Sequence, residues 1–375
     1  MSQSPRPPRV LHIVPALFDE KDGIVGGAER YAWELARHMA SEVPTTLLSF
    51  GSTDRSFTEG TLGVRVLGKP WHVRGSRHNP LSLRVLPELL RAEVVHCHQQ
   101  HLLVSSLSAV AARLTGRRVF VSDLGGGGWD FSSYVSTDRW FHGHLHISQY
   151  SRRVTGQEGK PWAHVILTGV DTDKFSPDPS VPKTGNALFV GRLLAHKGVD
   201  RVIEALPPDL PLDVVGRPYD PKYFALLQEL CAGKRVRFHV DLDDSKLVDI
   251  YRRSCCVVLP SLYRDRYGNE TRVPELMGQT LLEGMACGIP AVCTNVASMP
   301  EAVVDGVTGF VVPPDDLATM RSALATLCTD HARAEVMGTA ARARMLEHFQ
   351  WSGVVKRALG AYGAGFSAND APHIE

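Results

Sequence analysis

The sequence predicts an α/β protein built from two parallel-sheet domains in tandem. Three observations support this prediction. Short runs rich in Val and Ile recur along the chain, segments with helical periodicity lie between them, and the alternation stops at a polar, proline-rich stretch before it starts again. Strands buried on both faces give such apolar runs, and crossover helices give the segments between them. A chain of 375 residues is also longer than a single hydrophobic core usually accommodates.

The first half of the chain contains one complete set of alternating segments. Its strands are expected at residues 10–14, 45–50, 94–98, 119–122, 144–148 and 164–167, with helices at 28–40 and 102–114. The stretch 171–185 that follows contains three prolines and no periodicity, which is typical of a connection between domains. We therefore expect a first Rossmann-like domain over residues 1–180.

The alternation restarts in the second half and predicts a second Rossmann-like domain over residues 181–350. Its strands are expected at 187–190, 212–215, 236–240, 256–259, 291–294 and 309–312, with helices at 199–205, 223–232, 245–253, 279–287 and 317–327. Ligands of such sheets bind at the carboxyl ends of the strands. The predicted ligand site is therefore a central cleft that the two domains face.

The last part of the chain reads as helix with a break at residues 349–352. A terminal helix over about 351–366 is expected to pack back onto the first domain. Residues 367–375 are polar and are expected to form a flexible tail.

Composition excludes several classes of protein. Lys and Arg number 41 against 40 Asp and Glu, so no global field would attract nucleic acid. The seven cysteines form no Cys-x-x-Cys pair, which predicts a reduced cytoplasmic protein. No apolar stretch approaches membrane-spanning length, although docking at the inner face of a membrane stays open.

The most informative segment is 274–290, PELMGQTLLEGMACGIP. Glu275 is expected to precede a helix and Glu283 to lie inside it. The amides of residues near the helix start would face the same site, where a helix N-terminus favours phosphate. For an isolated pair of glutamates, an ordinary solvated role is the commoner outcome. The residues expected to offer these amides are Met277, Gly278, Gln279 and Thr280.

With these residues in place, the chain resembles glycosyltransferase family 4 of the GT-B fold. The signature of that family is a Glu, seven residues, a second Glu and a Met-Ala-Cys-Gly-x-Pro-like run, as in 275–290. An ordered set of matches is far more specific than a single motif, and the resemblance spans roughly residues 9–362. The further matches are GIVGGAE (23–29), VVHCH (94–98), ISQY (147–150), GVDTDKF (169–175), FVGRLLAHKG (189–198) and PEAVVDGVTG (300–309).

The resemblance implies transfer of a hexose from a nucleotide diphosphate sugar with retention of configuration, without a metal ion or other cofactor. Glu275 is then similar to the acid that holds the hexose hydroxyls, and Glu283 to the ribose binder. Arg192 and Lys197 resemble the basic pair at the diphosphate, where fixed cations stabilise the charge that develops on the leaving group. A solvated loop is the alternative for both basic residues.

Two glycine-rich loops of the first domain complete the candidate site. Gly26 and Gly27 precede a helix and would let backbone approach the donor phosphates. Many family members carry a histidine in the stretch that corresponds to 119–130, and this sequence has none there. Asp123 is the substitute candidate to contact the donor sugar or to receive the acceptor proton. Capping of the turn into the glycine run is an equally weighted alternative.

Clustered histidines raise the alternative of a metal site. His96, His98 and His101 lie close together in the sequence, and a second trio at 142, 144 and 146 shares one strand face. A structural zinc site needs four ligands in a compact frame. The sequence supplies no convincing fourth, so no metal ligands are predicted.

The resemblance leaves the substrates open. UDP-glucose and GDP-mannose are both compatible donors, and the acceptor is a saccharide, a lipid-linked sugar or a small molecule. The expected biological setting is bacterial polysaccharide, glycolipid or glycoside biosynthesis. Two other functions remain: a catalytically silent nucleotide-sugar-binding subunit, and a sugar-nucleotide epimerase of the same fold. The lack of the histidine keeps the first alternative open, whereas the intact set of basic and acidic residues argues for activity.

Overall fold

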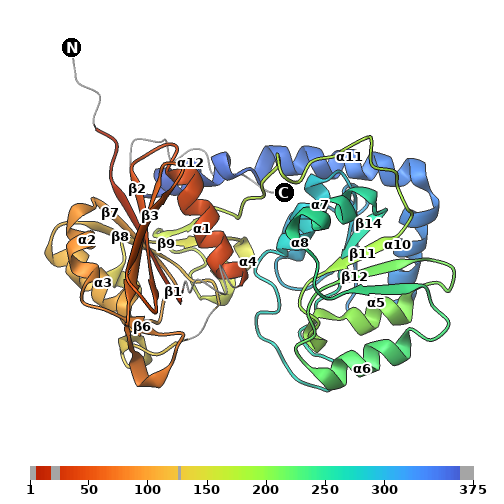
Figure 1. Ribbon diagram of the computed structural model, residues 1–375, viewed down its shortest axis with the longest axis horizontal. Helices are drawn as coiled ribbons and strands as arrows, with labels where there is room; N and C mark the ends of the chain where they lie inside the picture. The colour runs from red at the N-terminus through yellow and green to blue at the C-terminus, as the bar shows by residue number, and fades with distance from the viewer. Residues whose placement is uncertain (1–5, 18–25, 126–127, 364–375) are drawn as a thin grey trace, which may run out of the picture. The chain divides into compact units, whose positions relative to one another are not determined.

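The computed structural model describes residues 6–17, 26–125 and 128–363. The chain forms two compact units (Figure 1). Unit 1 contains the described residues up to Gly169 and those from Trp351 onward, and unit 2 contains Val170–Gln350. Each unit is a mainly parallel sheet with helices on its faces, so the prediction of two Rossmann-like domains is confirmed. The boundary between the units lies between Gly169 and Val170, just before the polar stretch 171–185.

The large sheet of unit 1 has eight strands in the order β10-β9-β8-β7-β1-β2-β4-β3. Every neighbouring pair is parallel except β3 with β4. The strands are β1 (Val10–Leu17), β2 (Thr45–Gly51), β3 (Arg55–Glu59), β4 (Leu62–Gly68), β7 (Val94–His98), β8 (Arg118–Ser122), β9 (Gly143–His146) and β10 (Ala163–Val165), with a separate pair β5 (Trp71–His72) and β6 (Pro80–Leu81). The helices are α1 (Gly27–Met39), α2 (Val85–Arg91), α3 (Leu103–Leu114), α4 (Gln149–Val154) and α12 (Trp351–Ala361), and the 3₁₀ turns are η1 (Val73–Gly75), η2 (Phe131–Ser133) and η3 (Asp138–Trp140).

The sheet of unit 2 has six strands, all parallel, in the order β13-β12-β11-β14-β15-β16. The strands are β11 (Ala187–Val190), β12 (Leu212–Val215), β13 (Val236–His239), β14 (Cys256–Leu259), β15 (Ala291–Thr294) and β16 (Gly309–Val312). The helices are η4 (Ala195–Lys197), α5 (Val199–Ala205), α6 (Pro221–Leu230), α7 (Asp244–Arg253), α8 (Gln279–Ala286), α9 (Met299–Ala302), α10 (Leu317–Thr329) and α11 (His331–His348).

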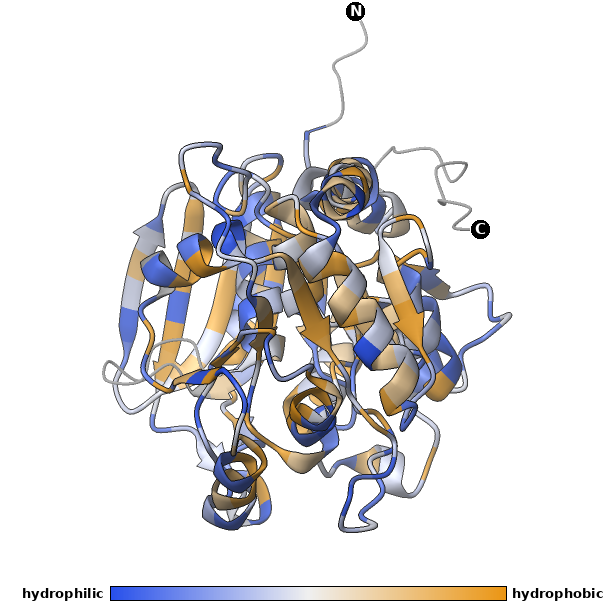
Figure 2. Cartoon of the chain, turned by 90° about the vertical axis from the view of Figure 1, so that its right-hand side faces the viewer, coloured by the Kyte–Doolittle hydropathy of each residue, from blue (hydrophilic) through white to orange (hydrophobic). Residues whose placement is uncertain are grey.

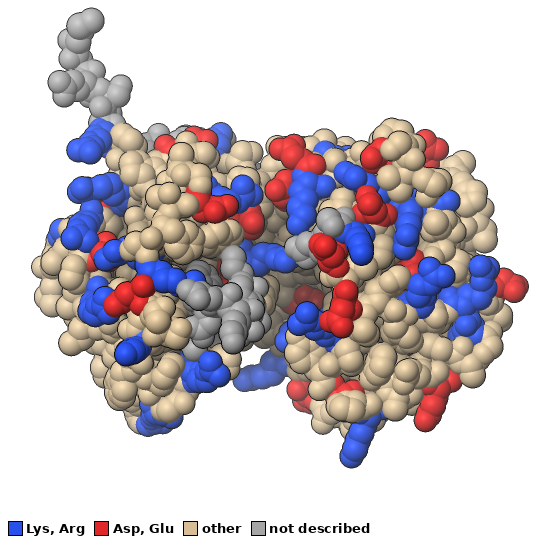
Figure 3. All heavy atoms as spheres, in the orientation of Figure 1, with Lys and Arg blue, Asp and Glu red and all other residues tan. Residues whose placement is uncertain are grey.

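Hydrophobic strands form the cores of both units. In unit 2 every residue of β11, β12, β14 and β15 is buried, as expected for strands covered on both faces. Figure 2 shows the hydrophobic strands and the polar residues on the outer surfaces of the helices. Figure 3 shows basic and acidic side chains interspersed over the face in view, in keeping with the near-balance of charges. Among the described helices, none combines the length and the hydropathy needed to cross a membrane.

The terminal helix α12 packs against α1 within unit 1 (Figure 1). The Trp351 ring stacks on His38 of α1 at a centroid distance of 5.7 Å. A Cβ on Gly169 would lie 2.3 Å from the Trp351 ring, so only glycine fits there. Near the end of the helix, the Tyr362 hydroxyl and His96 Nδ1 of β7 are joined by a hydrogen bond of 2.8 Å. The C-terminal helix therefore reaches the sheet of unit 1 as well as α1.

One cysteine pair corrects the expectation of a fully reduced chain. Cys255, just before β14, forms a disulfide with Cys328 in α10, and the two are 73 residues apart. The other described cysteines, Cys97, Cys231, Cys256, Cys287 and Cys293, are free. The sequence could not indicate this pair because it depends on the packing of α10 against β14.

Removal of this disulfide is expected to destabilise unit 2. Closing a loop of this length removes about 4 kcal/mol of entropy from the unfolded chain by the loop-entropy relation. The variant Cys328→Ser should therefore unfold at lower urea concentration than the wild type under oxidising conditions. The two proteins should coincide after reduction. Cys231→Ser, which changes a free cysteine, serves as the control and should not alter the difference between oxidised and reduced samples.

Candidate functional site

A buried ion pair lies at the carboxyl ends of β11 and β14 in unit 2. Lys197, in the turn after β11, forms a salt bridge with Glu275, and the side chains are only 10% and 15% exposed. Lys197 Nζ also donates to the Pro274 carbonyl at 3.1 Å. Ser261 Oγ, just after β14, donates to Glu275 Oε1 at 3.3 Å. Two of the predicted site residues are thus brought together and held in one orientation.

The position of Lys197 depends on the glycine that follows it. Gly198 has φ 68° and begins the approach to α5. A Cβ on Gly198 would lie 2.2 Å from the Pro260 carbonyl oxygen. Only glycine allows this left-handed conformation and this close backbone contact together. The turn after β11 therefore packs directly against the end of β14, and Lys197 in this turn lies beside Glu275.

The helix α8 begins shortly after Glu275, at Gln279. Its N-cap, Gly278, has φ 70° and provides no side-chain cap. A helix N-terminus carries partial positive charge and directs backbone N–H groups at an anion. Met277 is buried, so its side chain belongs to the core, whereas Gln279 and Thr280 in the first turn are half-buried. The sequence predicted this helix start correctly.

Glu283 lies one turn into α8 and is only 4% exposed. The Tyr251 hydroxyl of α7 donates to Glu283 Oε2 at 2.9 Å. A buried carboxylate is costly without such partners, so Tyr251 helps to hold Glu283 in place. Sequence reasoning did not identify Tyr251 or Ser261, because the partners of both residues are far away along the chain.

Arg192 is in the same segment as Lys197, between β11 and η4, but it is exposed. Its side chain forms no hydrogen bond or ion pair with any residue that the structure describes. Burial lowers the pKa of the neighbouring His196, and the positive charges of Lys197 and Arg192 lower that pKa further. Two positive charges thus follow β11: Lys197, which is paired with Glu275, and Arg192, whose side chain is exposed.

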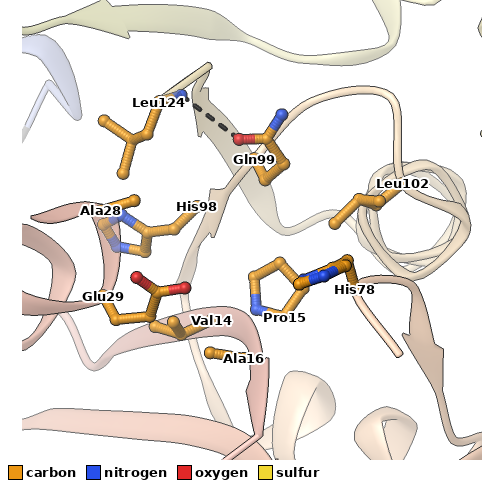
Figure 4. A pocket seen from close by; sticks show the side chains of 10 residues that line it. All are labelled: Val14, Pro15, Ala16, Ala28, Glu29, His78, His98, Gln99, Leu102 and Leu124. Atoms are coloured by element: carbon orange, nitrogen blue, oxygen red, sulfur yellow. Dashed lines mark hydrogen bonds between the residues drawn. The ribbon is translucent and has the colours of Figure 1, made fainter. Parts of the chain in front are cut away.

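Unit 1 has a small pocket of about 80 Å³ at the carboxyl ends of its central strands. Figure 4 shows side chains from the end of β1, the first turn of α1 and the end of β7 around it. Gln99 closes one side and accepts a hydrogen bond from the Leu124 N–H at 3.4 Å. The residues that line the pocket are Val14, Pro15, Ala16, Ala28, Glu29, His78, His98, Gln99, Leu102 and Leu124.

The glycines predicted to approach a ligand start α1 beside this pocket. Gly26 has φ 102°, and a Cβ there would lie 2.4 Å from Glu29 Oε2. Gly27 is the first residue of α1, and a Cβ there would meet open space. The preceding residues of the predicted loop, 23–25, lie outside the described residues. The backbone conformation thus favours glycine at Gly26, and the Glu29 side chain, which the sequence analysis did not select, lies against it.

Asp123 lies after β8 and caps the turn into the glycine run. Its Oδ1 accepts hydrogen bonds from the Gly125 N–H at 2.9 Å and from Gln99 Nε2 at 3.1 Å. Its Oδ2 is 3.9 Å from His101 Nε2. Asp123 does not line the described pocket, but it positions Gln99, which does. Residues 126–127 of the glycine run lie outside the described part of the chain.

The histidines form a cluster with a different membership from the two trios in the sequence. His12, His96 and His98 are buried, with ligand-type nitrogens within 4.8 Å of one another. His96 bonds to Ser122 Oγ at 2.9 Å and to the Tyr362 hydroxyl at 2.8 Å. A metal ion would have to displace these hydrogen bonds. By contrast, His101 bonds to Ser132 outside the cluster.

Family models match most of the chain. The model described as Glycosyl transferases group 1 matches residues 171–344. The model described as Glycosyltransferase Family 4 matches residues 25–174. The two matches overlap at residues 171–174 and together cover residues 25–344, which is most of both units.

Curated relatives carry the same signal. A GDP-mannose-dependent α-(1-6)-phosphatidylinositol monomannoside mannosyltransferase of Mycolicibacterium smegmatis is 31% identical over 224 residues, which cover 55% of this chain and 58% of the relative. A glycogen synthase of Mycobacterium tuberculosis is 32% identical over 210 residues, which cover 53% of this chain and 47% of the relative. The matched region thus spans about half the length of these relatives.

Solved structures share the fold. Anabaena Alr3699/HepE in complex with UDP and glucose has a TM-score of 0.69 at 17% identity, covering 95% of this chain and all of that chain. A sucrose-phosphate synthase from Thermosynechococcus elongatus has a TM-score of 0.66 at 17% identity, covering 96% of this chain and all of that chain. These similarities show the GT-B fold. The two family models, which together match residues 25–344, are those of the family that the sequence resembles, and on these matches the chain belongs to glycosyltransferase family 4.

Proposed function

We propose that the protein is a retaining glycosyltransferase that moves a hexose from a nucleotide diphosphate sugar to a hydroxyl acceptor. The observation that carries this proposal is the Lys197–Glu275 ion pair beside the N-terminus of α8, with Glu283 one turn further along the helix. Cations and helix amides suit a diphosphate, and carboxylates suit sugar hydroxyls. We infer retention of the anomeric configuration from the resemblance to the family.

The residues of unit 2 have distinct roles in this proposal. Breaking the bond between the sugar and the diphosphate adds negative charge to the leaving group. Lys197, Arg192 and the α8 N-terminus stabilise that charge, and stabilisation present mainly in the transition state raises kcat. The proposal includes no metal ion, because these groups provide the positive charge. Glu275 binds the donor hexose hydroxyls and Glu283 the ribose hydroxyls.

The proposed donor is of the UDP-glucose or the GDP-mannose type. The first is supported by the fold shared with a protein solved with UDP and glucose, and the second by the GDP-mannose-dependent mannosyltransferase relative. The acceptor is a saccharide, a lipid-linked sugar or a small molecule. A cytoplasmic site of action, with peripheral membrane contact for a lipid-linked acceptor, completes the proposal.

Nucleotide-induced stabilisation tests the donor site directly. A ligand that binds the folded state at a hundred times its Kd stabilises by about 2.7 kcal/mol, so UDP, GDP, ADP or one of their sugars should raise the Tm. Glu283→Ala and Arg192→Ala should lose most of this shift. Arg237→Ala, at an exposed position of β13, is the matched control and should keep it.

Three outcomes separate the alternatives. Stabilisation by one nucleotide class, with donor hydrolysis or transfer by the purified protein, supports the transferase. Stabilisation without turnover indicates the silent nucleotide-sugar-binding subunit, and interconversion of two nucleotide sugars indicates the epimerase. If no nucleotide raises the Tm of the wild type, the proposal of a donor site in unit 2 is wrong.

A further inference from the structure

The connection between β14 and α8 contains a loop with a defined conformation, which we call loop 263–271. The Thr271 N–H donates to the Tyr263 carbonyl at 2.7 Å and closes the loop at its base. At the tip, Asp265 Oδ1 accepts a hydrogen bond from the Tyr267 N–H at 2.9 Å. An aspartate that accepts from the backbone two residues further on stabilises a tight turn. The loop can therefore hold a side chain at a set position.

Arg266, at the tip of loop 263–271, connects the loop to α5. Its Nη1 donates to Asp200 Oδ2 at 3.2 Å and to Glu204 Oε1 at 3.3 Å. Asp200 is buried, and the Tyr223 hydroxyl of α6 donates to its Oδ1 at 2.7 Å. Among the described residues, Arg266 supplies the hydrogen bond to Oδ2. Because a buried carboxylate is costly without partners, this contact holds the loop on α5 and its neighbour α6 (Figure 1).

The contacts of the loop adjoin both partners of the Lys197–Glu275 ion pair. Asp200 comes three residues after Lys197 in the chain. Just before the loop, the Leu262 N–H donates to the carbonyl of His196, the residue that precedes Lys197, at 2.8 Å. Glu275 comes four residues after the loop ends. The loop therefore bridges the turn that carries Lys197 and the segment that carries Glu275.

The position of Glu275 depends on this bridge more than the position of Lys197 does. The turn with Lys197 is held by the contact of Gly198 with Pro260. Glu275 instead follows a loop that projects beyond the sheet, so the anchoring of that loop affects where its backbone lies. The groups of an active site have to be held close to the productive geometry, and a misplacement of about 1 Å can cost about a hundredfold in rate.

We propose that Arg266 is a positioning residue for the donor site. It binds the buried Asp200, anchors loop 263–271 on α5, and so keeps the Glu275 carboxylate beside Lys197, where it binds the donor hexose. Arg266 acts through the loop and needs no contact with donor or acceptor. The role of the site in sugar transfer rests on the proposed function, whereas the anchoring is a property of unit 2 by itself.

Hydrogen–deuterium exchange of the full chain tests the anchoring. Arg266→Met keeps the apolar stem of the side chain and removes its donors. Peptides that contain the N–H groups of Leu262 and Thr271 should exchange about tenfold faster in this variant, because the loop opens more often. The matched control is Arg264→Met. Arg264 is an exposed arginine of the same loop whose side chain forms no hydrogen bond or ion pair with a described residue, so this variant should exchange like the wild type.

Steady-state rates of sugar transfer or donor hydrolysis test the positioning. In Arg266→Met, kcat should fall about tenfold. The KM for the donor should change less than about threefold, because misplaced groups act most strongly on the transition state. Arg264→Met should keep the wild-type kcat.

Arg266→Lys distinguishes positioning from a general structural effect. A single nitrogen of Arg266, Nη1, makes both contacts with α5, so a lysine ammonium can replace it. This variant should recover most of the protection from exchange and most of the kcat.

The outcomes separate this inference from the proposed function. Faster exchange and lower kcat in Arg266→Met, both reversed in Arg266→Lys, support the positioning role. Unchanged exchange, faster exchange with wild-type kcat, or a loss of kcat that Arg266→Lys does not reverse overturns it. A wild type that no nucleotide stabilises removes the proposed function and the positioning role with it. An active wild type that Arg266→Met matches in kcat removes only the positioning role.

Discussion

Truncation of Lys197 to methionine is expected to lower the rate of sugar transfer by about 10²- to 10³-fold, the usual effect of removing one preorganised group that stabilises transition-state charge. Two losses combine in Lys197→Met. The leaving diphosphate loses a fixed cation, and the Glu275 carboxylate loses the partner that orients it. Because the cation acts on charge that develops during the reaction, kcat should fall more than the affinity for the donor.

Lys183→Met provides the matched control for this prediction. Lys183 is also in unit 2, and its Nζ donates to the Arg252 carbonyl at 2.8 Å, away from the ion pair. The control should keep wild-type kcat even if its Tm falls. Steady-state rates with the donor identified by thermal shift, together with melting curves for both variants, make the comparison. A Lys197→Met enzyme with wild-type kcat would remove Lys197 from the proposed mechanism.

Gly198→Ala should destabilise the protein by about 2–5 kcal/mol and also impair nucleotide binding. The left-handed backbone costs an alanine about 1–2 kcal/mol, and overpacking commonly adds 1–3 kcal/mol. The added methyl would meet the Pro260 carbonyl oxygen at 2.2 Å. Relief of that overlap has to move the turn after β11 away from β14, and Lys197 moves with it.

Gly233→Ala isolates the backbone contribution to that effect. Gly233 has φ 73°, close to the 68° of Gly198, but a Cβ there meets no atom within 4 Å. The control should therefore lose only the 1–2 kcal/mol of the left-handed conformation and keep normal nucleotide binding. Urea unfolding of both variants gives the two free energies of unfolding. Equal losses would show that the contact with Pro260 contributes nothing.

The parallel strands and crossover helices could be predicted because burial on both faces leaves a plain pattern in the sequence. The helix expected at 199–205 coincides with α5, and the strand expected at 309–312 with β16. The antiparallel pair β3 and β4 was missed. Four of the five residues of β3 are exposed, so this edge strand has no continuous apolar run to reveal it.

The site was predictable only as far as local pattern and family resemblance reached. Glu275 and Glu283 stood out because their motif is contiguous, whereas the contact of Glu275 with Lys197 joins residues 78 positions apart. The pocket of unit 1 was not predicted, because Glu29 and His98 come from α1 and β7. His98 was noted only as a metal candidate.

The return of α12 to unit 1 has a consequence for biosynthesis. A ribosome completes unit 2, which is continuous from Val170 to Gln350, before it releases the residues that finish unit 1. Until then the α1 surface that receives Trp351 stays uncovered, and His96 lacks the Tyr362 hydroxyl. Because domains fold as units during synthesis, the second half of this chain should mature first. A nascent chain stalled before Trp351 would therefore hold a folded unit 2 and an unfinished unit 1.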